Sequence, residues 1–292
     1  MLGPQHPPLR ALTERATQNA VAALGYPAPR VLLANADPAI LGGGFLVMER
    51  VAGRPLLDVR RVGVASVLVD MQLKLHALDA DVLLAALDRE APPNGRDLVS
   101  VASHLARFQR RIADGNLRGL ERAMAWLVQH QPKDDSARVI CHGDFHPQNL
   151  LMEGTRVTGV IDWPNVVVAD RACDVASTRV ILGLVPVALM GVPPALRGVV
   201  GIARRILVGR YVAGYRRRQP LHAGRLAYFE AFACMRGLVR TAEARLASGP
   251  DVSLNALDAS TFGERLGSRF ARLTGVAPSL PDPGTPIGPR SH

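Results

Sequence analysis

Residues 142–149 read HGDFHPQN, and residues 161–163, one short hairpin further along the chain, read IDW. The two segments supply two carboxylates, Asp144 and Asp162, and one side-chain amide, Asn149. Mg²⁺ prefers oxygen ligands of this kind, usually one or two carboxylates together with phosphate oxygens and water. An ionised carboxylate can also accept the proton of an attacking hydroxyl. The spacing therefore favours phosphoryl transfer, with Asp144 as the base and Asn149 and Asp162 as metal ligands.

The segments around this loop are expected to be short strands, Val139–Ile140 before it and Val157–Ile161 after it. Gly143 allows a sharp backbone path in the loop, and Pro147 stiffens it. Upstream, helical spacing predicts a helix at Leu9–Leu24, which the YPAP sequence of residues 26–29 ends.

The remaining chain is expected to contain two further strands and many helices. The strands are Arg30–Ala34 and Phe45–Met48, with a glycine turn at residues 42–44 between them and a linker at residues 51–55. The predicted helices are Val62–Leu78, Leu98–Ala113, Leu117–His130, Leu196–Arg218, Ala223–Ala247 and Asn255–Leu273.

The central block resembles the aminoglycoside phosphotransferase/choline kinase family, whose members typically read HGDxHxxN, then IDW, then GDPxxDLA. The third piece reads ADRACDVA at residues 169–176 here. The resemblance implies that Asp144 is the catalytic base and that Asn149 and Asp162 bind Mg²⁺. It also implies that Asp174 is a buried carboxylate bracing the catalytic loop. Three residues depart from the family pattern near the site: Pro164, Ala169 and Arg171.

The resemblance extends to the flanking segments and implies a fold. It is an α+β, two-lobed, protein-kinase-like fold with a truncated N-lobe sheet and a mostly helical C-lobe. Residues 1–52 are expected to form the partial N-lobe, residues 53–277 the C-lobe, and residues 278–292 a disordered Pro/Gly-rich tail. ATP is the implied cofactor beside Mg²⁺, and the adenine is expected at the hinge strand. The hinge residues that resemble this family's adenine site are Met48, Glu49, Arg50 and Val51.

One part of the family's nucleotide site is missing from the sequence. Glu14 stands where the family has a helix glutamate that pairs with a strand lysine, but no Gly-rich loop and no lysine precede it. Three explanations are open: a start site annotated downstream of the true one, a fragment, or a chain that has lost ATP chemistry and kept the fold. The alternative to an enzyme is therefore a catalytically silent kinase-like binding protein or an N-terminally truncated fragment.

The charge pattern bears on the acceptor. The net charge is +10 and almost entirely arginine, yet the arginines are scattered and no nucleic-acid recognition motif is present. Residues 175–229 contain nine arginines and no Asp or Glu. A polycationic aminoglycoside would favour carboxylates, whereas arginine suits carboxylates and phosphates. We therefore expect an anionic or neutral hydroxylated acceptor, although at least half of these arginines are expected to be solvated helix faces.

Several other interpretations are weaker. A zinc site at His142, Asp144 and His146 would leave Asn149 and Asp162 unexplained. The family resemblance implies instead that His142 supports the loop by hydrogen bonding, and His146 is expected to support the site or to pack. The three cysteines fit free thiols in a reducing cytoplasm, and no secretory signal is recognisable at the start of the sequence. The longest apolar run, residues 180–196, contains three prolines and is expected to be a buried helical corner rather than a membrane span.

Overall fold

The computed structural model describes residues 8–59, 63–91, 94–133, 138–185, 193–247 and 254–282. The chain divides into two compact units. Unit 1 comprises residues 1–101, 135–174 and 213–219, and unit 2 comprises residues 102–134, 175–212 and 220–292. Three predictions fall partly outside the described residues: the start of the helix at Val62, the middle of the apolar run, and residues 283–292 of the tail.

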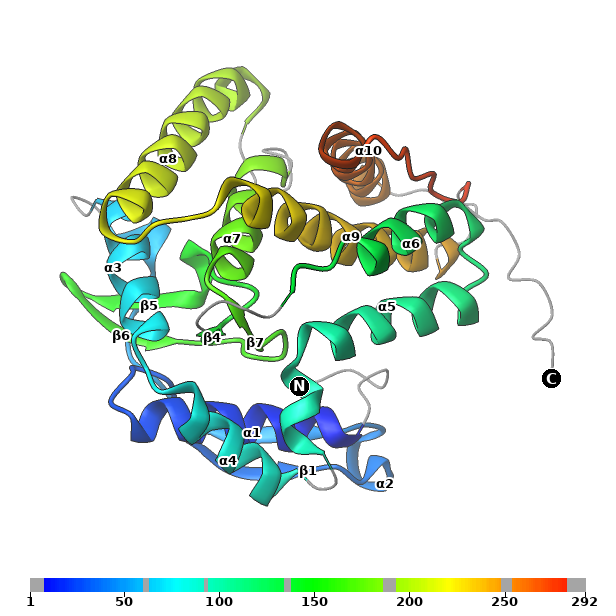
Figure 1. The fold of residues 1–292 in the computed structure, drawn as a ribbon. Coiled ribbons are helices and arrows are strands. Elements are labelled where there is room, and N and C mark those ends of the chain that lie inside the picture. The colour runs from blue at the N-terminus through cyan, green and yellow to red at the C-terminus, as the bar shows by residue number, and fades with distance from the viewer. Residues whose placement is uncertain are drawn as a thin grey trace. The chain divides into compact units, whose positions relative to one another are not determined.

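Unit 1 contains the first four helices and all the strands of the described chain (Figure 1). Its helices are α1 (Pro8–Ala23), α2 (Pro38–Leu41), α3 (Val64–His76) and α4 (Ala80–Glu90). Small side chains on one face of α1, including Ala16 and Ala20, are buried, and α1 packs against α4 and β1. Because these residues are small, the neighbouring elements approach α1 closely.

The strands of unit 1 form three small antiparallel sheets. One pairs β1 (Val31–Asn35) with β2 (Phe45–Met48), and another pairs β4 (Arg138–Cys141) with β7 (Val167–Asp170). The third has the order β3–β5–β6, formed by β3 (Arg54–Pro55), β5 (Leu150–Glu153) and β6 (Arg156–Val160).

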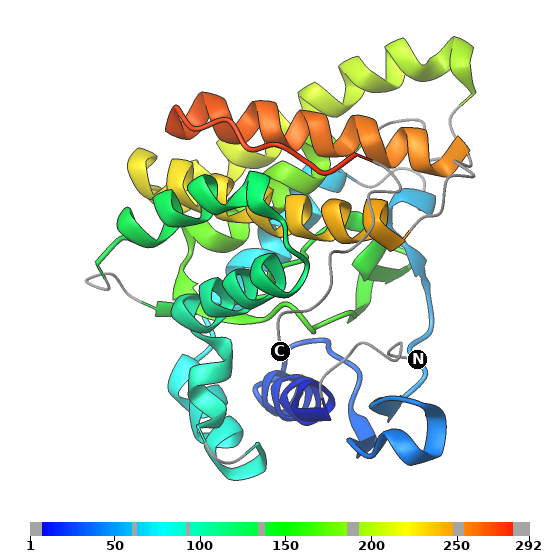
Figure 2. The same cartoon turned by 90° about the vertical axis from the view of Figure 1, so that its right-hand side faces the viewer.

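Unit 2 is helical where the structure describes it. Its elements are α5 (Val101–Asp114), α6 (Glu121–Gln129), most of α7 (Ala172–Leu184) and of α8 (Arg197–Arg218), α9 (Ala223–Ala247) and α10 (Leu254–Thr274). Figure 2 shows α10 running along α9, where the two helices pack. The core between them includes the carboxylate of Glu230, which is 1% exposed and pairs with Arg179 and Arg269.

Most predicted elements are present within about three residues, but helices α2, α4 and α7 and strands β5 and β7 were not predicted. Asp79 begins α4 by accepting the Asp81 N–H at 2.9 Å, and the leucines of this helix are buried. The predicted linker at residues 51–55 is wrong at its end, because Arg54 and Pro55 pair with β5 as strand β3. The two strands predicted around the loop belong to different sheets, since β4 pairs with β7 and β6 pairs with β5.

None of the helices within the described ranges combines the length and the apolar content that a membrane span requires. Of the predicted tail, residues 278–282 are described, and Ser279 donates its N–H to the carbonyl of Gly119 at 3.0 Å.

Candidate functional site

All eleven site residues predicted from the sequence lie in unit 1. The HGDFHPQN segment begins where β4 ends, and β4 is held in place by its pairing with β7. Strand β7 leads directly into α7, the helix that carries Asp174. Loop and helix therefore start from adjacent strands of one sheet.

Gly143 is the turning point of the loop. Its φ is +77°, a left-handed conformation that favours glycine, and a Cβ there would lie 2.1 Å from the carbonyl oxygen of Asn165. Its N–H donates to Oδ1 of Asp174 at 2.8 Å. The Asp174 carboxylate is fully buried, and burial alone would raise its pKa. Hydrogen bonds from His76 and from the Gly143 N–H outweigh burial, so the pKa of Asp174 is lowered and the group stays ionised.

His142 uses both ring nitrogens inside the loop. The Asp144 N–H donates to Nδ1 at 3.3 Å, so Nδ1 is an acceptor and the proton is on Nε2. That nitrogen donates to the carbonyl of Ile161 at 3.1 Å. Burial lowers the pKa of His142 despite the nearby carboxylates, in keeping with a neutral ring. The ring ties the HGDFHPQN loop to the segment just before Asp162.

Asn149 connects the same two segments. The side-chain nitrogen, Nδ2, donates to the backbone carbonyl of Asp144 at 2.9 Å. The backbone carbonyl of Asn149 accepts the N–H of Ile161 at 2.9 Å. An amide whose nitrogen is fixed in this way presents its oxygen on the opposite side. The Asp144 side chain is about one fifth exposed, at 19%, so its carboxylate is open to a ligand.

His146 lies beside Asp144. Its Nδ1 accepts the N–H of Gln148 at 3.3 Å, and its Nε2 lies 3.9 Å from Oδ1 of Asp144. Burial lowers the pKa of His146, while Asp144 and Asp162 act in the opposite direction. The Nε2 side of the ring therefore faces the Asp144 carboxylate, at a distance too long for a direct hydrogen bond.

Asp162 has a φ of +69° and is exposed. A non-glycine residue in the left-handed region costs roughly 1–2 kcal/mol, less for aspartate, and such residues are concentrated at functional sites. The next residue, Trp163, is fully buried, and its Nε1–H donates to the Val160 carbonyl at 2.9 Å. The indole ring also packs on the His142 ring with centroids 4.4 Å apart. The buried Trp163 side chain therefore anchors the backbone at Asp162, whose left-handed conformation it helps to maintain.

Glu14 brings α1 into the site. It is 4% exposed, its Oε1 accepts from Gln18 at 3.3 Å, and its Oε2 has no hydrogen-bond partner among the described residues. Burial, and secondly the charge of Asp162, raise the pKa of Glu14 from 4.5 to about 7. Arg10, one turn earlier on α1, offsets only part of this increase, and its Nη2 lies 3.4 Å from the Pro164 carbonyl. A buried carboxylate with one unsatisfied oxygen beside Asp162 favours a nearby cation.

Glu14→Gln is expected to change how stability depends on pH. In the wild type, the unfolded state ionises Glu14 above about pH 4.5, while the folded state keeps its proton up to about pH 7. The unfolded state then binds fewer protons, so the free energy of unfolding falls as pH rises through this window, by at most about 3 kcal/mol. The variant cannot titrate, so its stability relative to the wild type should increase from pH 4.5 to pH 7.

Urea unfolding at pH 5, 6, 7 and 8 measures this difference. Glu153→Gln is the matched control, because Glu153 has a 62% exposed side chain. Parallel pH profiles for wild type and Glu14→Gln would contradict the raised pKa.

The predicted adenine segment is positioned by two contacts. The Glu49 N–H donates to the Arg30 carbonyl at 2.9 Å, which continues the pairing of β1 and β2. Val51 packs on Gly159, where a Cβ would lie 2.7 Å from Cγ1 of the valine. Because Gly159 lies on β6 and precedes Asp162 by three residues, the segment ends close to the strand that leads to Asp162. Met48 is 37% exposed.

Two residues of the site were not identified from the sequence. Nε2 of His76 lies 3.2 Å from Oδ2 of Asp174, and Nδ1 of His76 lies 2.6 Å from the hydroxyl of Tyr215. The side chains of Tyr215, His76 and Asp174 are all buried and form a hydrogen-bonded chain. This chain ends at Asp174, which accepts the Gly143 N–H. The LH pair at residues 75–76 was a signal for His76; Tyr215, at the end of α8, had none.

The donor set fits Mg²⁺ better than zinc. Asn149 and Asp162 offer the hard oxygen donors that Mg²⁺ takes together with phosphate and water. His142 has no nitrogen left for a metal, because both are hydrogen-bonded. Within the described ranges no group of three or more His, Cys, Asp and Glu side chains forms a metal cluster. Cys141 and Cys173, the thiols beside the site, are buried and free.

Several known proteins are similar to this chain. A family model described as "Phosphotransferase enzyme family" matches residues 2–188. Rat acyl-CoA dehydrogenase family member 11 is 30% identical over 156 residues, covering 50% of this chain and 20% of the rat protein. Aminoglycoside 3'-phosphotransferase of Streptomyces fradiae is 33% identical over 169 residues, covering 52% of this chain and 57% of that enzyme. The matched segment is thus about a fifth of the rat relative.

Solved structures show the same fold. A Ralstonia eutropha JMP134 protein described as an aminoglycoside phosphotransferase has a TM-score of 0.64 at 21% identity, over 93% of this chain and 85% of that one. A thermostable mutant of aminoglycoside phosphotransferase APH(4)-Ia, in complex with ADP and hygromycin B, has a TM-score of 0.57 at 17% identity, over 90% and 82%. The predicted protein-kinase-like α+β fold is confirmed.

Proposed function

The chain belongs to the phosphotransferase enzyme family, and on that premise we propose that it transfers the γ-phosphoryl group of ATP to a hydroxyl of a small molecule. The observation that carries the proposal is the link between the two motif segments. Ile161, the residue before Asp162, is hydrogen-bonded both to the His142 ring and to the Asn149 backbone. Asp144, Asn149 and Asp162 are therefore held by one network, as a transfer site requires.

Each residue has a proposed role. Asp144 orients the acceptor hydroxyl and takes its proton, and the His146 ring packs beside Asp144 and limits the space around its carboxylate. Asn149 and Asp162 would hold Mg²⁺, which supplies charge neutralisation of the phosphates. Asp174 and His142 keep the loop in shape, and residues 48–51 would contact the adenine. The ADP complex of the APH(4)-Ia structure supports ATP as the donor.

The proposed acceptor is anionic, with a hydroxyacyl-CoA as the first candidate. Six arginines of α8 are exposed, namely Arg197, Arg205, Arg210, Arg216, Arg217 and Arg218, and the last of these pairs with Asp70. Others are occupied, since Arg179 pairs with Glu230 and Arg204 donates to the Val185 carbonyl. The rat relative is named for acyl-CoA, a molecule that carries phosphates. Arginine suits such groups, whereas residues 175–229 contain no Asp or Glu with which a polycationic aminoglycoside could pair.

A silent binding protein is the second candidate, and Glu14 is the observation that favours it. Oε2 of Glu14 is buried without a hydrogen-bond partner among the described residues, so no cation that a nucleotide site would use pairs with it there. Such a protein would bind nucleotide or acceptor without turnover. Binding and turnover therefore need separate measurements.

Nucleotide binding is tested by thermal unfolding with and without Mg·ATP. A ligand at 100 times its Kd stabilises the folded state by about 2.7 kcal/mol, so the wild-type melting temperature should rise by several degrees. Asp162→Asn should lose the Mg²⁺-dependent part, because asparagine tolerates the left-handed backbone but lacks the charge.

The exposed Asp114 provides the matched control, Asp114→Asn, which should respond like the wild type. ATP with EDTA measures any metal-independent binding. A wild type that gains no stability from Mg·ATP would contradict the proposed function.

A further inference from the structure

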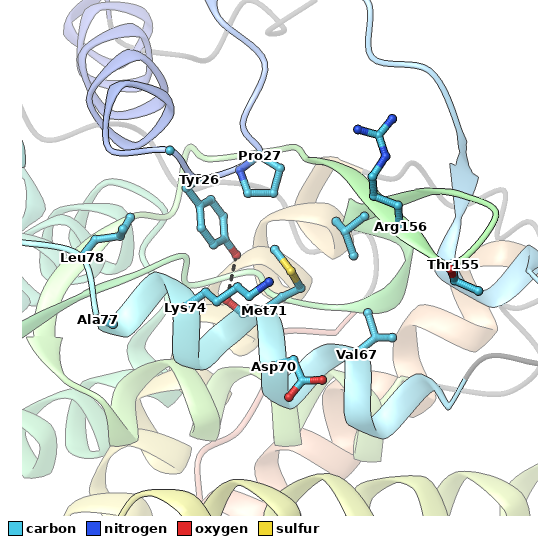
Figure 3. Close-up of a pocket in the computed structure, with 12 residues that line it drawn as sticks. Tyr26, Pro27, Val67, Asp70, Met71, Lys74, Ala77, Leu78, Thr155 and Arg156 are labelled. Atoms are coloured by element: carbon cyan, nitrogen blue, oxygen red, sulfur yellow. Dashed lines mark hydrogen bonds between the residues drawn. The ribbon is translucent and has the colours of Figure 1, made fainter.

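Unit 1 has a pocket that contains none of the predicted site residues (Figure 3). It has a volume of about 660 Å³, within the range of about 300–1,000 Å³ for small-molecule sites. Three segments far apart in the sequence line it: residues 25–27 after α1, residues 67–78 of α3 and its C-terminal end, and residues 155–157 at the turn between β5 and β6. A pocket with three independent walls is a candidate binding site.

The floor of the pocket is apolar and fixed. Tyr26 is 4% exposed, and its hydroxyl donates to the Met71 carbonyl at 3.1 Å. The Pro27 carbonyl accepts the N–H of Val160 at 2.6 Å, which fastens the loop to β6. Met71 is itself buried, and Val67 and Val157 complete the apolar lining. The floor is therefore suited to an apolar body such as an aromatic ring or a short alkyl chain.

The charge at the pocket comes from one lysine. Of the charged lining residues, Asp70 pairs with Arg218 and Arg156 pairs with Glu153. Lys74 has no ion-pair partner among the residues that the structure describes. Figure 3 shows its side chain reaching from α3 toward Met71 and the hydroxyl end of Tyr26. The unpaired charge at the pocket is therefore positive and lies above an apolar floor.

We propose that this pocket binds a small amphipathic anion, an aromatic or aliphatic molecule with one carboxylate or sulfonate, whose acidic group pairs with Lys74. The apolar part lies on Tyr26, Pro27 and Met71, where it is removed from water. The site is separate from the nucleotide site, so Mg·ADP does not compete with the anion. The proposal does not depend on the acceptor or on turnover.

The chain has only two lysines, Lys74 and Lys133, which makes a direct test possible. Reductive ¹³C-dimethylation keeps the lysine charge and gives two lysine signals beside that of the α-amino group. The Lys133→Met variant assigns them. The probe is 8-anilino-1-naphthalenesulfonate, and N-phenyl-1-naphthylamine, which has the same rings without the sulfonate, is the neutral control.

Titration with the sulfonate should shift the Lys74 signal to saturation and leave Lys133 unmoved. Lys74→Met should weaken sulfonate binding about three- to tenfold, which corresponds to roughly 1 kcal/mol for an exposed charge pair, and Lys74→Arg should keep it. Binding of the neutral probe to this pocket should be the same in all three proteins. Because Lys74 is exposed, these variants are expected to fold.

Three results would overturn the proposal: a Lys74 signal that does not move, equal sulfonate affinity in wild type and Lys74→Met, or displacement of the sulfonate by Mg·ADP. The last would place the probe in the nucleotide site. Failure of the proposed phosphotransferase function would leave these measurements unaffected, so the two proposals are tested independently.

Discussion

Asp144→Asn is expected to lower kcat about 10²- to 10⁴-fold, the usual contribution of a general base, with little change in the KM for ATP. Asparagine has the size of aspartate but cannot accept the acceptor proton. The loop should keep its shape, because Asn149 is anchored to the backbone carbonyl of residue 144 and not to its side chain. The hydrogen bond from residue 144 to the His142 ring also uses the backbone N–H, so the substitution leaves it in place.

The assay measures ADP release with Mg·ATP and a panel of hydroxyacyl-CoA esters, hydroxy acids and kanamycin, and the same panel tests the acceptor. Asp114→Asn should retain the wild-type rate. A wild type that phosphorylates kanamycin and no anion would contradict the proposed acceptor while supporting phosphotransfer. An Asp144→Asn variant as active as the wild type would remove Asp144 from the proposed mechanism.

Gly143→Ala is expected to destabilise the protein by roughly 2–4 kcal/mol, or to displace the catalytic loop and abolish activity. The left-handed backbone accounts for about 1–2 kcal/mol of this effect. The rest comes from the new Cβ, which would lie 2.1 Å from the Asn165 carbonyl oxygen. Moving the loop to relieve this clash would weaken the bond from the Gly143 N–H to Asp174.

Gly275→Ala separates the two causes. Gly275 has nearly the same φ, +75°, but nothing lies within 4 Å of its added Cβ. Urea unfolding should therefore give only the backbone cost for Gly275→Ala and the larger value for Gly143→Ala. Equal losses in the two variants would show that the close approach to Asn165 does not matter.

The helices of the described chain were largely predictable, because their apolar periodicity is local. Helix α9 has its predicted bounds, Ala223–Ala247, and α1, α3 and α8 differ only by a few residues. Helix α4 was missed although Asp79 is a good cap, since its leucines follow the end of α3 too closely to stand out. The strands were harder: β3 has two residues and exists only because β5 lies beside it.

For the site, the sequence motif indicated which side chains carry the proposed chemistry. The structure then showed which hydrogen bonds hold these side chains in place. His76 and Tyr215 lie 139 residues apart in the chain and meet only in the folded protein, behind Asp174. The burial of Glu14 beside Asp162 likewise depends on where α1 packs. No local pattern encodes such meetings, because they arise from packing between distant segments.

The sequence alone therefore determined the family resemblance, the three side chains that supply oxygen atoms to the proposed site, and the need for glycine at the turn of the loop. It did so because metal ligation and backbone conformation depend on residue type and short spacing. Only the tertiary structure decided the neutral tautomer of His142, the ionised state of Asp174, the raised pKa of Glu14 and the pocket at Lys74. These properties follow from burial and from neighbours contributed by remote parts of the chain, which fold together but are not adjacent in sequence.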